Sequence, residues 1–313
     1  MIGRRLVLGG MAGLTACASQ ARTLAPTLVA YDRSRIGGGM RIGSQWSEPD
    51  GTVRHLSFTL PPEALTEAAR QVAPPRPEQV QHQAMAAAQA VADHAPAGVQ
   101  LELRPKPFGL DLHGTAPPGY DLTALMNTVM AAYRQANNQA VIDAGFRFIA
   151  ENVVQPDYAR ITAGQSALLD DTAREIGRQM TGLDARGRVQ FLLSFLQSLT
   201  YQVLHSRGQQ AMRTPAGVLA DGRGDCDAKS ITLATLLAVI DPGLSTVLIY
   251  DDQHAFPGVA LPVLPGDPAF QLGGRSYVAV EPVGPGWFPV GQLSDQSRAI
   301  LASGMAKTTL LRG

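Results

Sequence analysis

The chain contains only two cysteines, and each lies in a short motif of a different character. Cys17 ends the run LTAC, which closes an apolar leader. Cys226 lies in the run GDCD, directly before a strongly helical stretch. A glycine-containing turn thus brings Cys226 to a helix N-terminus, where the helix dipole and unpaired backbone N–H groups favour thiolate over thiol. The second motif constrains the fold most, because it fixes a turn, a helix start and a reactive thiol at one point.

Residues 1–16 have the layout of an export signal, with two arginines, a short apolar run and small residues before Cys17. The apolar run is too short to cross a bilayer as a helix. With its LTAC ending, the leader resembles a bacterial lipoprotein signal, which implies a lipid on Cys17 and residues 17–30 as a tether. We expect an exported protein that faces the periplasm, on the outer membrane in preference to the inner. A plain cleaved signal is the alternative, and the paired arginines leave the export route open.

The rest of the chain has the composition of a folded, nearly neutral protein. Without residues 1–16, 24 basic and 26 acidic residues remain, so no basic surface for a nucleic acid is expected. The chain is 45% apolar over 313 residues, which favours two domains. If Cys17 carries lipid, Cys226 is the only thiol in an oxidising compartment. Catalysis, an intermolecular bridge or deep burial would each explain it, and its setting favours catalysis.

The first half of the chain divides at the run PPG near residue 118. Residues 31–115 predict a small α+β domain, with alternating strands at 53–60 and 99–103 and an Ala-rich helix at 78–94. Residues 118–183 predict a helical segment, in which Asp121 caps the first helix and further helices cover 141–154 and 166–180.

Residues 184–313 predict a C-terminal domain of helices followed by strands. An apolar helix covers 184–200, and a buried helix at 231–240 follows Cys226. Strands are then expected at 244–250, 254–261 and 275–282. The whole chain therefore predicts an α+β fold.

Two further residues fit the chemistry of Cys226. A thiol nucleophile needs a base to take its proton and a third group to orient that base. His254 begins one predicted strand and Glu281 ends the next. Adjacent antiparallel strands would bring these two side chains together, with Cys226 presented from the helix tip. A structural carboxylate at a strand end is the alternative for Glu281.

Four short sequence blocks surround these residues: TP and VL at 214–219, GRGDCD at 222–227 with Ser230, the run HAF from His254, and Glu281 before proline. Together they resemble the transglutaminase-like superfamily of papain-type thiol enzymes, over roughly residues 184–290. The resemblance implies a papain/transglutaminase-like core, a helix packed on an antiparallel sheet. It implies Cys226 as nucleophile, His254 as general base and acid, and Glu281 as orienting carboxylate. The family usually has aspartate at the third position, and often tryptophan where Phe256 stands.

Tyr201 and Gln202 match a family position that can face the nucleophile, so either is a candidate oxyanion donor, beside the backbone N–H of Cys226. The implied activity is attack on amide or peptide bonds of an envelope protein or peptide, with hydrolysis expected ahead of transamidation. A catalytically silent module that binds peptides or proteins is the alternative, and a lipoprotein assembly factor acting through residues 30–180 is a third.

No cofactor and no metal are expected, because the histidines lack metal-ligand spacing. A calcium ion held by four aspartates stays an open alternative to their capping and solvation. These residues are Asp225, Asp227, Asp251 and Asp252.

Overall fold

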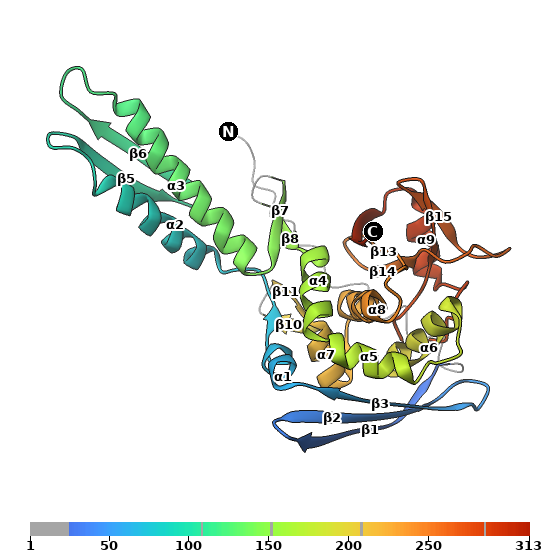
Figure 1. Ribbon diagram of the computed structural model, residues 1–313. Helices are drawn as coiled ribbons and strands as arrows, with labels where there is room; N and C mark the ends of the chain where they lie inside the picture. The colour runs from blue at the N-terminus through green and yellow to red at the C-terminus, as the bar shows by residue number, and fades with distance from the viewer. Residues whose placement is uncertain (1–24, 108, 151–152, 207–208, 285) are drawn as a thin grey trace. The chain divides into compact units, whose positions relative to one another are not determined.

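A computed structural model describes residues 25–107, 109–150, 153–206, 209–284 and 286–313 (Figure 1). The fold is α+β, with antiparallel pairing in its larger sheets. The chain forms two compact units. Unit 1 contains residues 162–203 and 213–313 together with the described chain up to residue 70, and unit 2 contains residues 71–161 and 204–212.

Unit 1 contains two antiparallel sheets and most of the helices. Its helices are α1 (Pro62–Ala68), most of α4 (Tyr158–Leu168), α5 (Asp170–Arg178), α6 (Ala185–Ser198), α7 (Pro215–Asp221), α8 (Cys226–Ile240) and α9 (Asp295–Ser303). Its first sheet has the order β1-β2-β3 and contains β1 (Thr27–Ile36), β2 (Gly39–Ser47) and β3 (Val53–Leu60). Its second sheet has the order β15-β16-β14-β13-β17 and contains β13 (Thr246–Tyr250), β14 (Ala255–Val259), β15 (Ala269–Leu272), β16 (Arg275–Ala279) and β17 (Lys307–Arg312).

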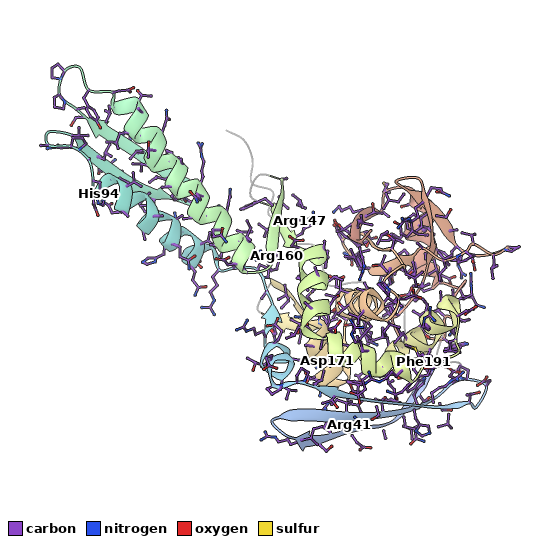
Figure 2. All side chains as sticks on the ribbon, viewed as in Figure 1. Arg41, His94, Arg147, Arg160, Asp171 and Phe191 are labelled. Atoms are coloured by element: carbon purple, nitrogen blue, oxygen red, sulfur yellow. The ribbon has the colours of Figure 1, made fainter. Side chains whose placement is uncertain are left out.

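The first sheet packs against the helices of unit 1 and shares their core. Strand β3 has the predicted bounds, and its apolar positions Leu56, Phe58 and Leu60 are buried, as the alternation of the sequence indicated. Trp46 of β2 donates a hydrogen bond of 2.7 Å to Ser194 Oγ on α6, and its ring contacts Phe191 edge-on at 5.5 Å. Figure 2 labels Phe191 on α6 and Arg41 on the sheet. The sheet therefore completes the core that surrounds α6.

Helix α8 lies inside unit 1, in contact with α5, α6 and α7 and with strands β13 and β14 (Figure 1). Every residue from Ala228 to Ala238 is buried, because small and apolar side chains are spread over all faces of the helix. It begins where the Asp225 side chain accepts a hydrogen bond of 2.9 Å from the Ala228 N–H. A buried helix with an N-terminal cap of this kind holds its first residue, Cys226, in a fixed place.

Unit 2 is a smaller α+β body. Its elements are β4 (Gln71–Val72), α2 (Pro77–Ala92), β5 (Gln100–Lys106), β6 (Gly109–Thr115), α3 (Leu122–Asp143), β7 (Phe146–Ala150), β8 (Val153–Pro156), β10 (Leu204–Ser206) and most of β11 (Gln209–Arg213). Helices α2 and α3 pack on each other and on the β5–β6 hairpin through small and apolar side chains such as Ala84, Ala88 and Val129. Asp121 caps α3 as predicted, accepting from the Ala124 N–H at 3.0 Å.

The compact units differ from the expected domains. Residues 31–115 do not form one body, because residues up to 70 belong to unit 1 and the remainder to unit 2. Nor do residues 184–313 stand alone, since the sheet β1–β3 supplies part of their core and residues 204–212 lie in unit 2. The apolar faces of β2 and β3 pack on α6. These segments lie more than 120 residues apart in the chain, so no local sequence pattern predicts the contact.

Two local expectations were also wrong. Strand β1 begins at Thr27, inside the expected tether of residues 17–30, and pairs with β2 along its length. The expected helical segment of residues 118–183 is interrupted by the β7–β8 hairpin. Gly145, at φ +81°, is outside the helical region of the backbone, so helix α3 ends before it. The β-branched and aromatic residues that follow favour strands.

The expected export signal, residues 1–16, and Cys17 lie outside the described residues. In the part of the chain that the structure describes, no helix combines the length and the apolarity needed to span a membrane.

Candidate active site

A tight turn brings the chain to Cys226. Gly222 ends α7 in the left-handed region, at φ +67°, and the two-residue strand β12 (Arg223–Gly224) follows. A Cβ on Gly224 would lie 3.0 Å from Val218 Cγ2 and 3.4 Å from Ala228 Cβ, so this position is tight for any larger residue. Cys226 is then the first residue of α8.

The Cys226 thiol is partly buried among acidic neighbours. Its sulfur lies 3.7 Å from Asp227 Oδ1. Burial, and then the carboxylates of Asp227 and Asp225, raise the pKa of Cys226 well above its ordinary value, although backbone N–H groups of Ala255 and Asp227 act in the opposite sense. The expectation that the helix start favours thiolate is therefore corrected, because burial and two carboxylates outweigh the backbone donors.

His254 directly precedes β14 and is held by a turn. Asp251 Oδ1 accepts hydrogen bonds from the backbone N–H groups of Gln253, at 2.7 Å, and His254, at 2.8 Å. The imidazole stacks on Phe256 with 5.8 Å between ring centroids. The turn and the stacking fix both the backbone and the ring of His254.

Helix α8, which begins at Cys226, packs against β14, the strand that His254 directly precedes. The backbone N–H of Ala255 acts to lower the pKa of Cys226, and the Ala255 carbonyl accepts from Ser230 Oγ at 3.3 Å. The residue next to His254 therefore contacts the first turns of α8. Among the described contacts, no hydrogen bond joins the Cys226 thiol to the His254 ring.

Glu281 is buried and reaches His254, with 3.4 Å between Oε1 and Nε2. Strand β16 pairs with β14 so that Ala279 lies opposite Gly258, and the Val280 N–H donates to the Pro257 carbonyl at 2.9 Å. This register, extended, places Glu281 opposite Phe256 and on the same face of the sheet as His254. Glu281 therefore meets the His254 ring diagonally across the β14–β16 pair.

Two serines contact the same carboxylate, and sequence reasoning missed both. Ser294 caps α9, accepting from the Ser297 N–H at 3.1 Å, and its hydroxyl donates to Glu281 Oε2 at 3.0 Å. Ser297 is fully buried, donates to Glu281 Oε2, and lies 3.1 Å from His254 Nε2. A serine before an aspartate is a recognisable helix-start signal, but nothing local places this helix beside Glu281.

A buried lysine, also missed, lies one turn along α8 from Cys226. Lys229 is fully buried, and its Nζ donates to the Leu199 carbonyl at the end of α6 at 2.7 Å. Burial lowers the pKa of Lys229 to about 7, opposed by the negative charges of Asp225 and Glu281. Burial and the neighbouring charge of Asp227 raise the pKa of Asp225 to about 7. Asp225, which precedes Cys226, and Lys229, one turn after it, are thus a carboxyl and a lysine that both titrate near neutral pH.

The two oxyanion candidates lie beside the cysteine turn. Strand β9 (Thr200–Tyr201) pairs in parallel with β12, and the Gln202 N–H donates to the Gly224 carbonyl at 3.2 Å. Arg213 Nη2 donates to Gln202 Oε1 at 2.9 Å, which fixes the carboxamide oxygen. The amide NH₂ of Gln202 therefore points away from Arg213. Tyr201 is more exposed to solvent than Gln202, with 39% of its surface accessible.

The aspartates considered for calcium are engaged separately. Asp225 caps α8, Asp251 holds the turn before His254, and Asp252 pairs with Lys307 at 3.0 Å. Within the described ranges, no group of three or more histidine, cysteine or acidic side chains is arranged to hold a metal ion.

Comparison with known proteins adds no relative: no family model matches the chain, and no curated protein or solved structure is similar enough to indicate a relationship.

Proposed function

We propose that the chain is a thiol hydrolase of the transglutaminase-like type, acting on amide or peptide bonds through Cys226, His254 and Glu281. The observation that carries the proposal is the buried contact of 3.4 Å between His254 Nε2 and Glu281 Oε1, beside the helix start that presents Cys226. A base oriented by a carboxylate next to a thiol is the arrangement that nucleophilic catalysis requires. The papain/transglutaminase-like core, a helix packed on an antiparallel sheet, is part of this proposal.

In the proposed reaction, the resting thiol is neutral, because its surroundings raise the pKa of Cys226. His254 takes the thiol proton as sulfur attacks the substrate carbonyl, and then gives it to the leaving amine. Glu281 orients the ring and stabilises the imidazolium. The Cys226 N–H and the amide NH₂ of Gln202 are the donors proposed for the oxyanion. Water then attacks the thioester, releases the acid and regenerates the thiol, while an amine in its place would give transamidation.

The substrate proposed is a protein or peptide of the cell envelope. This follows from the leader, which resembles a lipoprotein signal and would place the protein on the periplasmic side of a membrane through a lipid on Cys17.

The second candidate is a peptide-binding module without turnover. It is favoured by the contact of the Cys226 thiol with Asp227 and by the raised pKa of Cys226, since both oppose thiolate formation. The two functions differ in whether a covalent thioacyl intermediate forms.

Intact-protein mass spectrometry separates the two candidates. The full chain with Cys17→Ser, in which Cys226 is the only thiol, is mixed with a panel of p-nitrophenyl esters and N-acyl peptide amides. The proposal predicts an acyl adduct that Cys226→Ser lacks, and release of acid that His254→Ala slows. Peptide binding without adduct or product would favour the binding module and contradict the hydrolase.

A further inference from the structure

Ser297 contacts both members of the His254–Glu281 pair, and among the described residues no other hydroxyl is seen to do so. Its Oγ lies 3.1 Å from His254 Nε2 and donates to Glu281 Oε2. The side chain is fully buried in the first turn of α9, so these contacts are shielded from water. A hydrogen bond in such surroundings is stronger than one at the surface.

The direct contact between the pair is long for a hydrogen bond. Glu281 Oε1 lies 3.4 Å from His254 Nε2, and this buried oxygen has no hydrogen-bond partner within the described part of the chain. Ser297 is closer to the ring nitrogen than the carboxylate is. The carboxylate therefore acts on the imidazole partly through the serine hydroxyl.

Proton positions follow from this arrangement. A serine hydroxyl has one hydrogen, and Ser297 directs it to Glu281, so its lone pairs remain to accept from His254 Nε2–H. The proton on Nε2 leaves Nδ1 unprotonated in the neutral ring, and Nδ1 is the atom available to a thiol. The geometry of Ser297 thus selects the tautomer that a general base needs.

Ser294 holds Ser297 in place. It caps α9 through the Ser297 N–H, at 3.1 Å, and donates to the same Glu281 oxygen at 3.0 Å. The start of α9 also supplies the positive end of a helix dipole to the Glu281 carboxylate. Ser303, near the other end of α9, donates instead to the Ile300 carbonyl at 2.8 Å, which makes it a control on the same helix.

We infer that Ser297 is a positioning residue that links Glu281 to His254 and holds the imidazole in its Nε2–H form. The inference rests on the proposed function, because it assigns the support of the same base. It also explains how glutamate serves where aspartate is usual in the family that the sequence resembles.

The test measures the rate of Cys226 alkylation by iodoacetamide against pH, in the full chain with Cys17→Ser. Ser297→Ala is expected to lower the His254-dependent rate near pH 7 by about tenfold, the effect of one lost hydrogen bond. Ser303→Ala, which removes a hydroxyl from the other end of the same helix, is expected to leave that rate within about twofold of the parent. Equal rates for Ser297→Ala and the parent would overturn the inference.

The pair Ser297→Thr and Ser297→Val covers the case in which alanine disturbs packing or folding. The two side chains have the same shape, and only threonine keeps the hydroxyl. Threonine is expected to react faster than valine near pH 7, and equal rates would count against the inference.

Nitrogen-15 NMR of His254 gives a readout that needs no reaction. The inference predicts the Nε2–H form in the parent and a mixture of tautomers in Ser297→Ala, and an unchanged spectrum would contradict it. If His254→Ala reacts like the parent, the proposed function fails. If only His254→Ala is impaired and Ser297→Ala is not, the inference about Ser297 alone fails.

Discussion

Glu281 meets His254 diagonally across the β14–β16 pair, from a position opposite Phe256, and spans the distance with its longer side chain. The carboxylate, the imidazole and the two serines of α9 form one connected group, in which Glu281 and Ser297 are buried.

Glu281→Asp is expected to impair the site, although aspartate is usual in the family that the sequence resembles. The shorter side chain cannot reach Nε2 from a position opposite Phe256. We expect the His254-dependent alkylation rate of Cys226 near pH 7 to fall about tenfold or more, since small misplacements carry large kinetic costs. Glu281→Gln keeps the length and serves as the matched variant. A rate for Glu281→Asp at or above that of the parent would show that reach does not matter.

Lys229→Met is expected to change how the free energy of unfolding depends on pH above neutrality. The pKa of Lys229 is about 7 in the folded chain and near 10.5 when unfolded, so between these values the unfolded state binds more protons. Stability from this group is present at high pH and is lost as the pH falls through 7. The parent should gain about 2–3 kcal/mol of unfolding free energy between pH 7 and pH 9.5 that the variant lacks. Urea unfolding at both values measures this, and parallel curves would contradict it.

Asp225→Asn is expected to change how the free energy of unfolding depends on pH below neutrality. The pKa of Asp225 is raised from 3.8 to about 7, so stability from this group is present at low pH and is lost as the pH rises through 7. Asparagine keeps the cap on α8 and cannot ionise. Between pH 4.5 and pH 7, the parent should lose about 2–3 kcal/mol relative to the variant. The same loss in both proteins would refute the assignment.

Phe58→Ala tests whether the sheet β1–β3 belongs to the unit that holds Cys226. Phe58 is fully buried and packs on Phe195 of α6, with ring centroids 6.3 Å apart. Its removal should cost about 3–5 kcal/mol of unfolding free energy, measured in urea with the alkylation of Cys226 as a second probe. Phe148→Ala, at a half-exposed position of β7, is the control and should change little. Coincident transitions by both probes are expected, and a separate transition for the sheet would contradict the shared core.

Much of the local structure could be predicted from the sequence. The alternation of apolar and polar residues predicted the bounds of β3, and the capping residue Asp121 predicted the start of α3. A polar residue at a helix start leaves a local signal, because its partner lies within one turn. The apolar run after Cys226 likewise predicted a buried helix, which α8 is.

The parts that could not be predicted depend on contacts between distant segments. The packing of Trp46 on α6, and of Ser297 on Glu281, joins segments whose separation no local pattern encodes. Lys229 had a signal, because a lone lysine in an all-apolar helix has to be buried, yet its carbonyl partner Leu199 had none. The β7–β8 hairpin was missed because a short apolar run fits a helix or a strand equally well.

The measurement that tests the central claim most directly is the pH dependence of Cys226 alkylation by iodoacetamide, in the full chain with Cys17→Ser, compared with the same protein carrying His254→Ala. The raised pKa of Cys226 predicts that the variant reacts only at alkaline pH. With His254 as general base, the parent should also react near pH 7, at least about a hundredfold faster than the variant. Superimposed profiles, each rising only at alkaline pH, would contradict the Cys-His pair and leave the binding module as the function.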